Sequence, residues 1–480
     1  MNPSESPLRD RGRETIEWAG LEPIADDERH GTARQVGVLW FAAQLVPSAV
    51  FLGLLGPQLG LGFGASLAAI VLGNLLGALG PAILCVSGPK TGTPTLGQAR
   101  GLFAGSTWLV GLLAALTSVS FIALGAVFGG QALRAAFGLP LGAGILLVFL
   151  VEAAVSVLGY EVLHRFERWS AILGACGFLT VSIVVVAKGI DPAAIGGTGG
   201  GWGSFVLLAA ITFGFAFGWA HNAPDYSRYL PATTSSVRLF GATYLGITLA
   251  CIWMEALGLA AARYLEGSDA MAALYDLMGG SPGGALVMVA MFVGVAANAA
   301  VAQYSAGLQL MGVGVLLPRP LVTAGVALFA FALTIYLVSG ELTDTFSNVL
   351  LLSTYWVGPF VGVWGVVWWR GRSVPAPTRL SSAEWRRRSL AGALALVLGY
   401  LAALPFSSTT AGAQLADSGS PLAVVCGSIS RNVLDGADLA YPVGILAGAL
   451  IYGLLLGGRR TAPSDGVRRP AHLEPTGEPA

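Results

Sequence analysis

Long apolar stretches alternate with short polar connections along the chain, and this pattern predicts membrane-spanning helices. A helix needs about 20 apolar residues to cross the roughly 30 Å hydrocarbon core, where every backbone polar group must be satisfied within the segment. Twelve stretches meet this requirement: residues 35–57, 62–87, 105–133, 141–160, 169–187, 202–222, 239–262, 283–317, 321–339, 346–369, 389–406 and 439–457. We therefore expect an all-α polytopic membrane protein with about 12 transmembrane helices. We expect an N-terminal tail, 1–34, before the spans and a disordered tail, 458–480, after them.

Composition and charge agree with this prediction. Only 11% of the 480 residues are charged and the net charge is zero. Soluble domains carry about 25% charged residues, so a soluble enzyme or a nucleic-acid-binding protein is excluded. Of the 26 Lys and Arg residues, only Arg134, Lys188, Arg263 and Arg431 fall in predicted outer loops. Because cytoplasmic loops carry an excess of Lys and Arg, both tails are predicted to be cytoplasmic. The strong excess of Arg over Lys favours a bacterial cytoplasmic membrane.

Motifs for metal, cofactor or covalent chemistry are missing from the sequence. Cys85, Cys176, Cys251 and Cys426 stand singly in apolar stretches, without a CxxC pair or a His at metal-ligand spacing. We expect them to be buried thiols, with no metal site and no cofactor. A membrane-embedded enzyme would need clustered catalytic side chains, and a channel would need a ring-forming filter or a charge-lined helix. The sequence shows neither feature, so we expect no enzymatic activity.

Two of the predicted spans are interrupted at corresponding places. Pro47 lies inside the first span and removes one backbone hydrogen bond. Gly214 and Gly218 lie inside the sixth span. Interrupted helices in the first and sixth positions point to a five-plus-five inverted repeat with a substrate site near the middle of the membrane.

Two carboxyl groups, Glu152 and Glu255, fall within predicted spans, where a charge costs at least about 2.5 to 3.5 kcal/mol. Glu255 either carries a proton that couples to transport or is a protonated carboxyl that hydrogen-bonds inside the bundle. For Glu152 the sequence favours the structural interpretation.

Aromatic and amide side chains on the interrupted spans and their neighbours supply a candidate substrate site. Aromatic faces stack on planar rings, and an amide can match the donor and acceptor edge of a heterocycle. The candidate residues are Gln44, Phe121, Phe217, Trp219, Asn298 and Gln303. The expected partners are a small heterocyclic substrate, a coupling cation and the lipid bilayer. The sequence does not indicate an oligomeric state.

Several motifs resemble the nucleobase:cation symporter-1 family, particularly its purine and cytosine permease branch. The most specific are GYEVLHRFERW at 159–169 and GWAHNAPDYSRYLP at 218–231, with GPKTGTPTLGQARGLFAG, GGQAL, MEALG and NVLLLSTYWVGPFVGVW in the same order along the chain. The resemblance implies a LeuT-type fold, with inverted repeats at 35–188 and 202–369 and two further spans at 389–457. It also implies uptake of a nucleobase or a related heterocycle, driven by a cation gradient.

Within this resemblance, Asn298 is similar to the family's eighth-span asparagine and Trp219 to its sixth-span aromatic residue. Phe121 stands where many relatives have a tryptophan. A second amide of some relatives would fall on Ala302, beside Gln303.

The resemblance also bears on the coupling cation. Relatives with a sodium site carry small hydroxyl side chains just before the asparagine, and those positions resemble Ala296 and Ala297 here. We therefore expect H+ rather than Na+ coupling, with Glu255 or Glu152 as the carrier. The leading substrate is cytosine, a purine or uracil. The alternative is a hydantoin, allantoin, thiamine or pyridoxine, possibly with Na+.

Overall fold

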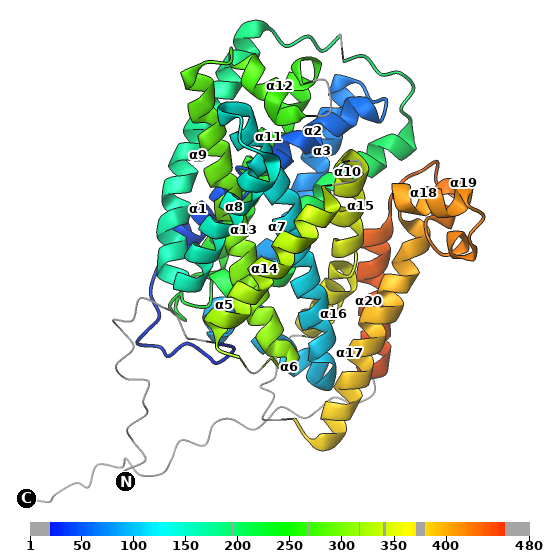
Figure 1. The fold of residues 1–480 in the computed structure, drawn as a ribbon. Coiled ribbons are helices and arrows are strands. Elements are labelled where there is room, and N and C mark those ends of the chain that lie inside the picture. The colour runs from blue at the N-terminus through cyan, green and yellow to red at the C-terminus, as the bar shows by residue number, and fades with distance from the viewer. Residues whose placement is uncertain are drawn as a thin grey trace, which may run out of the picture.

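The predicted fold class is confirmed by the computed structural model, which describes residues 20–193, 195–265, 269–315, 317–338, 342–370 and 380–456 (Figure 1). In these ranges every regular element is a helix. Ten helical stretches are long and apolar enough to cross a membrane, and one bent pair makes an eleventh. A further apolar helix of 17 residues matches the twelfth predicted stretch. The predicted C-terminal tail, 458–480, and residues 1–19 lie outside the described residues.

The first six predicted spans correspond to ten α-helices and two 3-10 helices, one of which is the short Ala104–Ser106. They are α1 (Ala33–Ala43) with α2 (Pro47–Gln58), α3 (Phe63–Gly77) with α4 (Leu79–Cys85) and α5 (Ser87–Thr91), α6 (Thr95–Phe103) with α7 (Thr107–Phe137), α8 (Leu141–Leu158), α9 (Tyr160–Lys188), and α10 (Trp202–Phe217), which continues as the 3-10 helix Gly218–Tyr226.

The remaining spans are interspersed with short helices. They are α11 (Ser236–Ala261), α12 (Ala270–Leu277), α13 (Pro282–Val313), α14 (Arg319–Leu337), α15 (Leu342–Thr354), α16 (Val357–Trp369), α17 (Ser382–Ala403), α18 (Thr410–Asp417), α19 (Ser428–Val433) and α20 (Ala440–Leu456). Figure 1 shows α17 and α20 side by side at one flank, with α18 and α19 at one end of this pair.

The long helices α7 and α13 pack against each other along the centre of the bundle. Their contact is close at Gly129 of α7, where a Cβ atom would lie 3.1 Å from Val295 of α13. A second close contact joins α2 and α11. A Cβ atom on Gly53 would lie 1.9 Å from the Glu255 carbonyl oxygen, so this approach requires glycine. The second pair includes α2, which is the later half of the interrupted first span.

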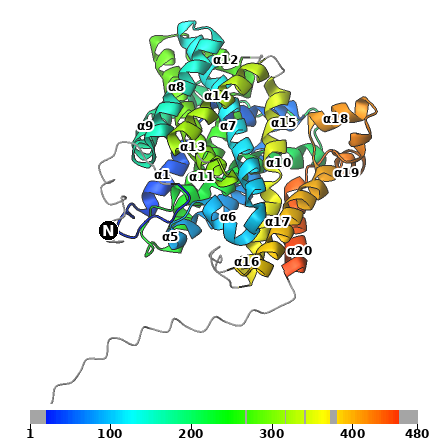
Figure 2. The same ribbon diagram turned by 60° about the horizontal axis from the view of Figure 1, so that its bottom comes forward.

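Part of the predicted N-terminal tail lies across one end of the bundle (Figure 2). Leu21 and Ile24 are buried there. The Ile24 N–H donates to the Gly92 carbonyl at 2.9 Å, and the Arg29 guanidinium donates to the Pro89 carbonyl at 2.9 Å. The segment before α1 is therefore part of the packed structure.

The four cysteines are free thiols, but only two of them are buried as predicted. Cys85 and Cys251 are buried, whereas Cys176 is exposed and Cys426 is half-buried. Cys176 lies on α9, and an apolar stretch in a span can face lipid as well as the protein interior. The prediction of burial is therefore wrong for Cys176 and Cys426.

Candidate functional site

The first span is broken between α1 and α2, directly before Pro47. The two helices meet at a bend of 56°, and Val46 is extended. In a continuous helix the N–H of residue 47 would donate to the carbonyl of Ala43, but proline has no N–H to donate. The chain therefore leaves the Ala43 carbonyl in the middle of the bundle without its helical partner.

A side chain from α13 donates a hydrogen bond to this carbonyl. The Asn298 Nδ2 donates a hydrogen bond to the Ala43 oxygen. One turn earlier on α13, a Cβ atom on Gly294 would lie 2.6 Å from the Leu45 carbonyl oxygen. Gly294 and Asn298 are thus the α13 residues that these contacts place against the break.

An aromatic stack lies beside the break. The Phe121 ring on α7 and the Trp219 ring on the 3-10 helix are parallel to within 1°, with centroids 5.6 Å apart. Trp40 of α1 meets Trp219 edge-on at 5.7 Å, which ties the stack to the turn of α1 that leads into the break. Gly218 makes room for the stack, because a Cβ atom there would lie 3.0 Å from Phe121 Cζ.

Two buried hydrogen-bond donors, one at the break and one in the aromatic stack, have no partner among the described residues. They are the Gln44 Nε2 amide and the Trp219 Nε1 indole nitrogen. The other end of the Gln44 amide is held, because its Oε1 accepts from the Cys251 thiol at 3.7 Å. A buried donor without a partner costs about 1–3 kcal/mol. A ligand with acceptor atoms would recover this free energy.

The structure places two of the predicted site residues elsewhere. The Phe217 ring packs against Phe213 at 4.7 Å and against Tyr441 of α20 at 5.9 Å. The Gln303 Nε2 donates to the Thr323 carbonyl of α14 at 3.0 Å. Gly214 likewise faces α20, where its Cβ position is 2.1 Å from the Tyr441 hydroxyl. Gln44, Phe121, Trp219, Asn298 and Gly218 therefore make up the site around the break, which we call the break site.

The two intramembrane carboxyls occupy different surroundings. Glu255 accepts a hydrogen bond from Asn74 Nδ2 on α3, and its other oxygen has no partner among the described residues. It lies one turn after Cys251, the residue that contacts Gln44. Neither carboxyl oxygen of Glu152 on α8 has a hydrogen-bond partner among the described residues. Glu255 is thus linked to the break site through one helical turn.

A polar cluster at the end of the sixth span escaped the sequence analysis. The Tyr226 hydroxyl contacts the Val301 carbonyl and the Ser305 hydroxyl, both at 2.7 Å. Asp225 accepts from the Thr95 N–H at 2.8 Å and from Ser305 at 2.7 Å. The motif GWAHNAPDYSRYLP was a signal for these residues, but their partners are far away in the sequence.

A family model described as a permease for cytosine/purines, uracil, thiamine and allantoin matches residues 23–444. The chain belongs to this family. Its relatives are permeases and other transporters rather than enzymes, which agrees with the sequence analysis.

Named relatives match about half of the chain. The purine-cytosine permease FCY2 of Saccharomyces cerevisiae is 29% identical over 55% of this chain and 52% of its own length. The putative purine-cytosine permease YxlA of Bacillus subtilis is 27% identical over 51% of this chain and 53% of its own length. The chain thus spans about half the length of these relatives in the matched regions.

Solved structures agree with the LeuT-type fold. Mhp1, a nucleobase-cation-symport-1 family transporter, has a TM-score of 0.70 in a closed conformation with bromovinylhydantoin bound. It is 16% identical, and the match covers 92% of this chain and 96% of that chain. A Na+-coupled sialic acid symporter has a TM-score of 0.58 at 15% identity and is covered to 91%, with 89% of this chain matched. These likenesses concern the fold.

Proposed function

We propose that the protein is a secondary transporter that imports a nucleobase of the cytosine, purine or uracil type together with a cation. One observation carries this proposal: a parallel aromatic pair lies beside a helix break that presents two buried donors without partners among the described residues. A nucleobase has two flat faces for Phe121 and Trp219 and ring acceptors for Gln44 and Trp219. The centroid distance of 5.6 Å leaves no room between the rings, so the base would stack on the pair or part it.

The proposed coupling ion is H+. The α13 residue against the Leu45 carbonyl is Gly294, and Ala296 and Ala297 stand just before Asn298. None of these three residues supplies a side-chain oxygen, and a hard cation such as Na+ prefers oxygen ligands. Glu255 is the favoured proton carrier, because one of its carboxyl oxygens has no partner among the described residues and Cys251 links it to Gln44. Glu152 is the alternative.

A second candidate function uses the same site for another small heterocycle. The family description includes thiamine and allantoin, and Mhp1 was solved with a hydantoin. A vitamin B6 transporter of Saccharomyces cerevisiae is also 27% identical over 55% of this chain. Hydantoin, allantoin, thiamine and pyridoxine are therefore the alternative substrates, with Na+ as the alternative coupling ion. We also place both termini in the cytoplasm, from the distribution of Lys and Arg over the loops, and the membrane in a bacterium, from the excess of Arg over Lys.

The test is uptake of a labelled panel into proteoliposomes. The panel holds cytosine, uracil, adenine, hypoxanthine, allantoin and thiamine, and an imposed proton gradient is compared with a sodium gradient. We expect proton-driven accumulation of one nucleobase. Accumulation driven only by sodium would contradict the coupling proposal. Uptake of allantoin or thiamine alone would select the second candidate function.

A matched pair of variants tests the role of the stack. Trp219→Leu removes the ring that faces Phe121, whereas Phe217→Leu removes a ring that packs on Tyr441. Loss of an aromatic contact and of the indole donor should weaken substrate affinity about tenfold or more in Trp219→Leu. Phe217→Leu should leave the affinity within about twofold while lowering thermal stability. Equal losses of affinity in both variants would contradict the proposed stack.

A further inference from the structure

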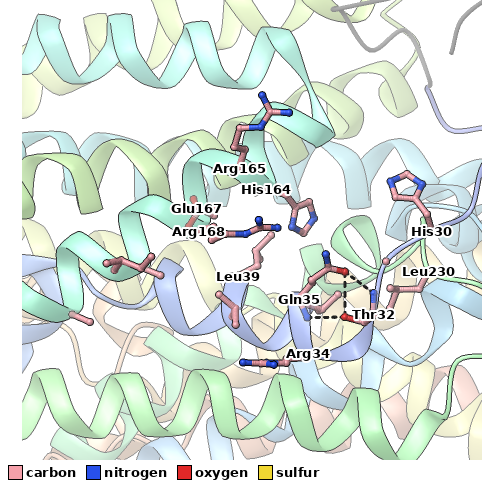
Figure 3. A pocket seen from close by; sticks show the side chains of 16 residues that line it. His30, Thr32, Arg34, Gln35, Leu39, His164, Arg165, Glu167, Arg168 and Leu230 are labelled. Carbon is pink, nitrogen blue, oxygen red and sulfur yellow. Dashed lines mark hydrogen bonds between the residues drawn. The ribbon is translucent and has the colours of Figure 1, made fainter. Parts of the chain in front are cut away.

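The two ends of the bundle expose different side chains. At the end where α1 begins, a cavity of about 820 Å³ lies between the beginnings of α1 and α9, and its lining includes exposed arginines (Figure 3): Arg34, Arg165 and Arg168. At the other end, residues 407–439 connect α17 to α20 and form α18, a 3-10 helix (Pro421–Val424) and α19. We call residues 407–439 the excursion. Within it, residues 418–430 include no charged side chain.

The uncharged part of the excursion exposes apolar side chains. In the sequence PLAVV at 421–425, Leu422 is 60% exposed and Val424 is 75% exposed, and Val425 is exposed as well. We call residues 421–425 the apolar tip. Contiguous exposed apolar side chains mark a contact surface, because leaving them in water is unfavourable.

Backbone hydrogen bonds fix the level of the apolar tip relative to the spans. The Gly427 N–H, two residues after the tip, donates to the Leu404 carbonyl at 2.8 Å. The Leu439 N–H, at the end of the excursion, donates to the Phe406 carbonyl at 3.0 Å. Both acceptors lie within the candidate span Ser382–Phe406. The tip is therefore attached at the level where this span ends.

A second contact marks the same level. The excursion touches the beginning of α10, where a Cβ atom on Gly203 would overlap the Asp435 carbonyl oxygen. The neighbouring Trp202 is 63% exposed. Tryptophan is enriched at the level of the lipid headgroups. The excursion therefore lies at the boundary of the membrane.

The excursion lies beside a surface that faces lipid. Figure 1 shows α18 and α19 at the edge of the molecule, beyond α17 and α20 and below the level of α12, and Figure 2 shows them at the edge again. Leu398 and Leu401, in the last turns of α17, are exposed. Exposed apolar side chains on a span face lipid. The apolar tip thus continues the lipid-facing surface of α17.

The backbone of the apolar tip is prepared for an apolar medium, in which polar groups without partners are costly. The Ala423 N–H donates to the Ser420 carbonyl, and the Cys426 N–H donates to the Leu422 carbonyl, both at 2.9 Å. The Arg431 guanidinium donates to the Ala423 carbonyl at 3.0 Å and to the Cys426 carbonyl at 2.8 Å. The guanidinium thus closes the turn on which the exposed apolar side chains stand.

From these observations we propose that the apolar tip inserts into the lipid bilayer beside α17, in the leaflet opposite the beginning of α1. Leu422, Val424 and Val425 would lie among the upper parts of the acyl chains. A stable protein interface buries about 800 Å² per partner, and three side chains supply far less. Insertion into lipid has no such threshold, because each apolar side chain adds to it. The occupant of this surface is therefore the membrane itself.

A fluorescent probe measures the depth of the tip in proteoliposomes. The thiols of Cys176 and Cys426 are first replaced by serine, since Cys85 and Cys251 are buried. A nitrobenzoxadiazole probe is then attached to Val424→Cys or, as the control, to Asp417→Cys at an exposed position of α18. Lipids with a nitroxide near the glycerol should quench the probe at 424 about threefold or more above the probe at 417. Iodide in the water should quench them in the reverse order.

Two results would overturn the proposal. Equal quenching of the two probes by iodide would show that the tip lies in water. Protection of the probe at 424 from both iodide and the nitroxide lipid would show that a protein, such as a second copy of the chain, covers the tip.

Photoactivatable lipids test the wild-type protein, so this measurement does not depend on the folding of a variant. A phospholipid with a diazirine in the upper part of its acyl chain is reconstituted with the protein and activated, and the labelled peptides are identified by mass spectrometry. We expect labels on residues 421–425 as well as on α17. Labels on α17 without any on 421–425 would contradict the proposal.

A matched pair of variants tests the contribution of the guanidinium. Arg431→Ala removes the donors to two backbone carbonyls of the turn, whereas Asn432→Ala changes the neighbouring exposed residue. Labelling of 421–425 relative to α17 should fall about threefold or more in Arg431→Ala, because the freed carbonyls favour water. The ratio should stay at the wild-type value in Asn432→Ala. An unchanged ratio in Arg431→Ala would contradict the proposed role of the guanidinium.

Discussion

The two interrupted spans differ in how their polar groups are satisfied. At the first break, the Ala43 carbonyl is served by the Asn298 side chain, and the Gln44 amide keeps a donor without a partner among the described residues. At the sixth span, α10 continues directly into a 3-10 helix. The end of that helix is fastened at Tyr226 to the Val301 carbonyl and the Ser305 hydroxyl. Both spans thus keep a buried donor without a partner among the described residues, at Gln44 and at Trp219, but the sixth span is also attached to α13 through Tyr226.

This difference suggests a division of roles between two halves that share an inverted repeat. In the proposed site, the first break would supply polar contacts to the substrate. The sixth span supplies an aromatic face, Trp219, and an anchor at Tyr226 that holds this face in place. Transporters of this fold work by moving one bundle against another around a fixed site. A movement of the sixth span relative to α13 would have to break the bonds of Tyr226 to Val301 and Ser305. A movement of both helices together would leave these bonds intact.

The largest effect is expected for Asn298→Ala, which leaves the Ala43 carbonyl without a donor. An unsatisfied buried acceptor costs about 1–3 kcal/mol, so substrate uptake should fall about tenfold to a hundredfold. Membrane abundance should stay near that of the wild type. Gln303→Ala is the matched control, since it removes another α13 amide that donates to a backbone carbonyl away from the site. Equal uptake by the two variants would place Asn298 outside the site.

Glu255→Gln should separate coupling from binding. Glutamine keeps an oxygen that can accept from Asn74 Nδ2, so the fold should persist, but it cannot release a proton. We expect gradient-driven accumulation to be lost and equilibrative exchange of substrate to continue. Undiminished uphill transport in Glu255→Gln, together with its loss in Glu152→Gln, would assign the coupling to α8 instead.

Pro47→Ala tests whether the first break depends on the backbone N–H that proline lacks. Alanine supplies an N–H that can bond the Ala43 carbonyl and compete with Asn298, so uptake should fall about fivefold. Pro57→Ala, at a second proline of α2, is the control and should have little effect. A wild-type rate in Pro47→Ala would show that the break does not depend on proline.

Tyr226→Phe, with the smallest expected effect, weakens the anchor of the sixth span. The lost hydroxyl bonds are worth about 1 kcal/mol, so the transport rate should change about two- to fivefold while substrate affinity stays constant. Tyr275→Phe, which loses a bond to the nearby Gly280 carbonyl, is the control. A change of affinity in Tyr226→Phe without a change of rate would place this residue in the binding step.

The sequence predicted the spans well because apolar length alone determines them, and each of the twelve stretches matches helices in the structure. Individual site residues were harder to predict. Phe217 and Trp219 are two residues apart, which is about 200° around a helix, so they contact different neighbours. Hydropathy does not indicate which of the two faces the site.

Contacts between distant spans could not be predicted from the sequence pattern either. Cys251 could be predicted as a buried thiol, but its contact with Gln44 depends on how α11 packs beside the first span. The position of Gly294 against Leu45 depends on how α13 is rotated about its axis. A rotation of α13 by one residue moves every side chain by about 100°, and the pattern of a helix that is apolar on all sides does not specify it.

The most direct test of the break site is a cryo-electron-microscopy map of the protein with the base that the uptake panel selects. We expect density for a flat ring in contact with Phe121 or Trp219, within hydrogen-bonding distance of Gln44 or Asn298. Density for the base beside Phe217, or in the cavity between α1 and α9, would contradict the claim that the first break holds the substrate.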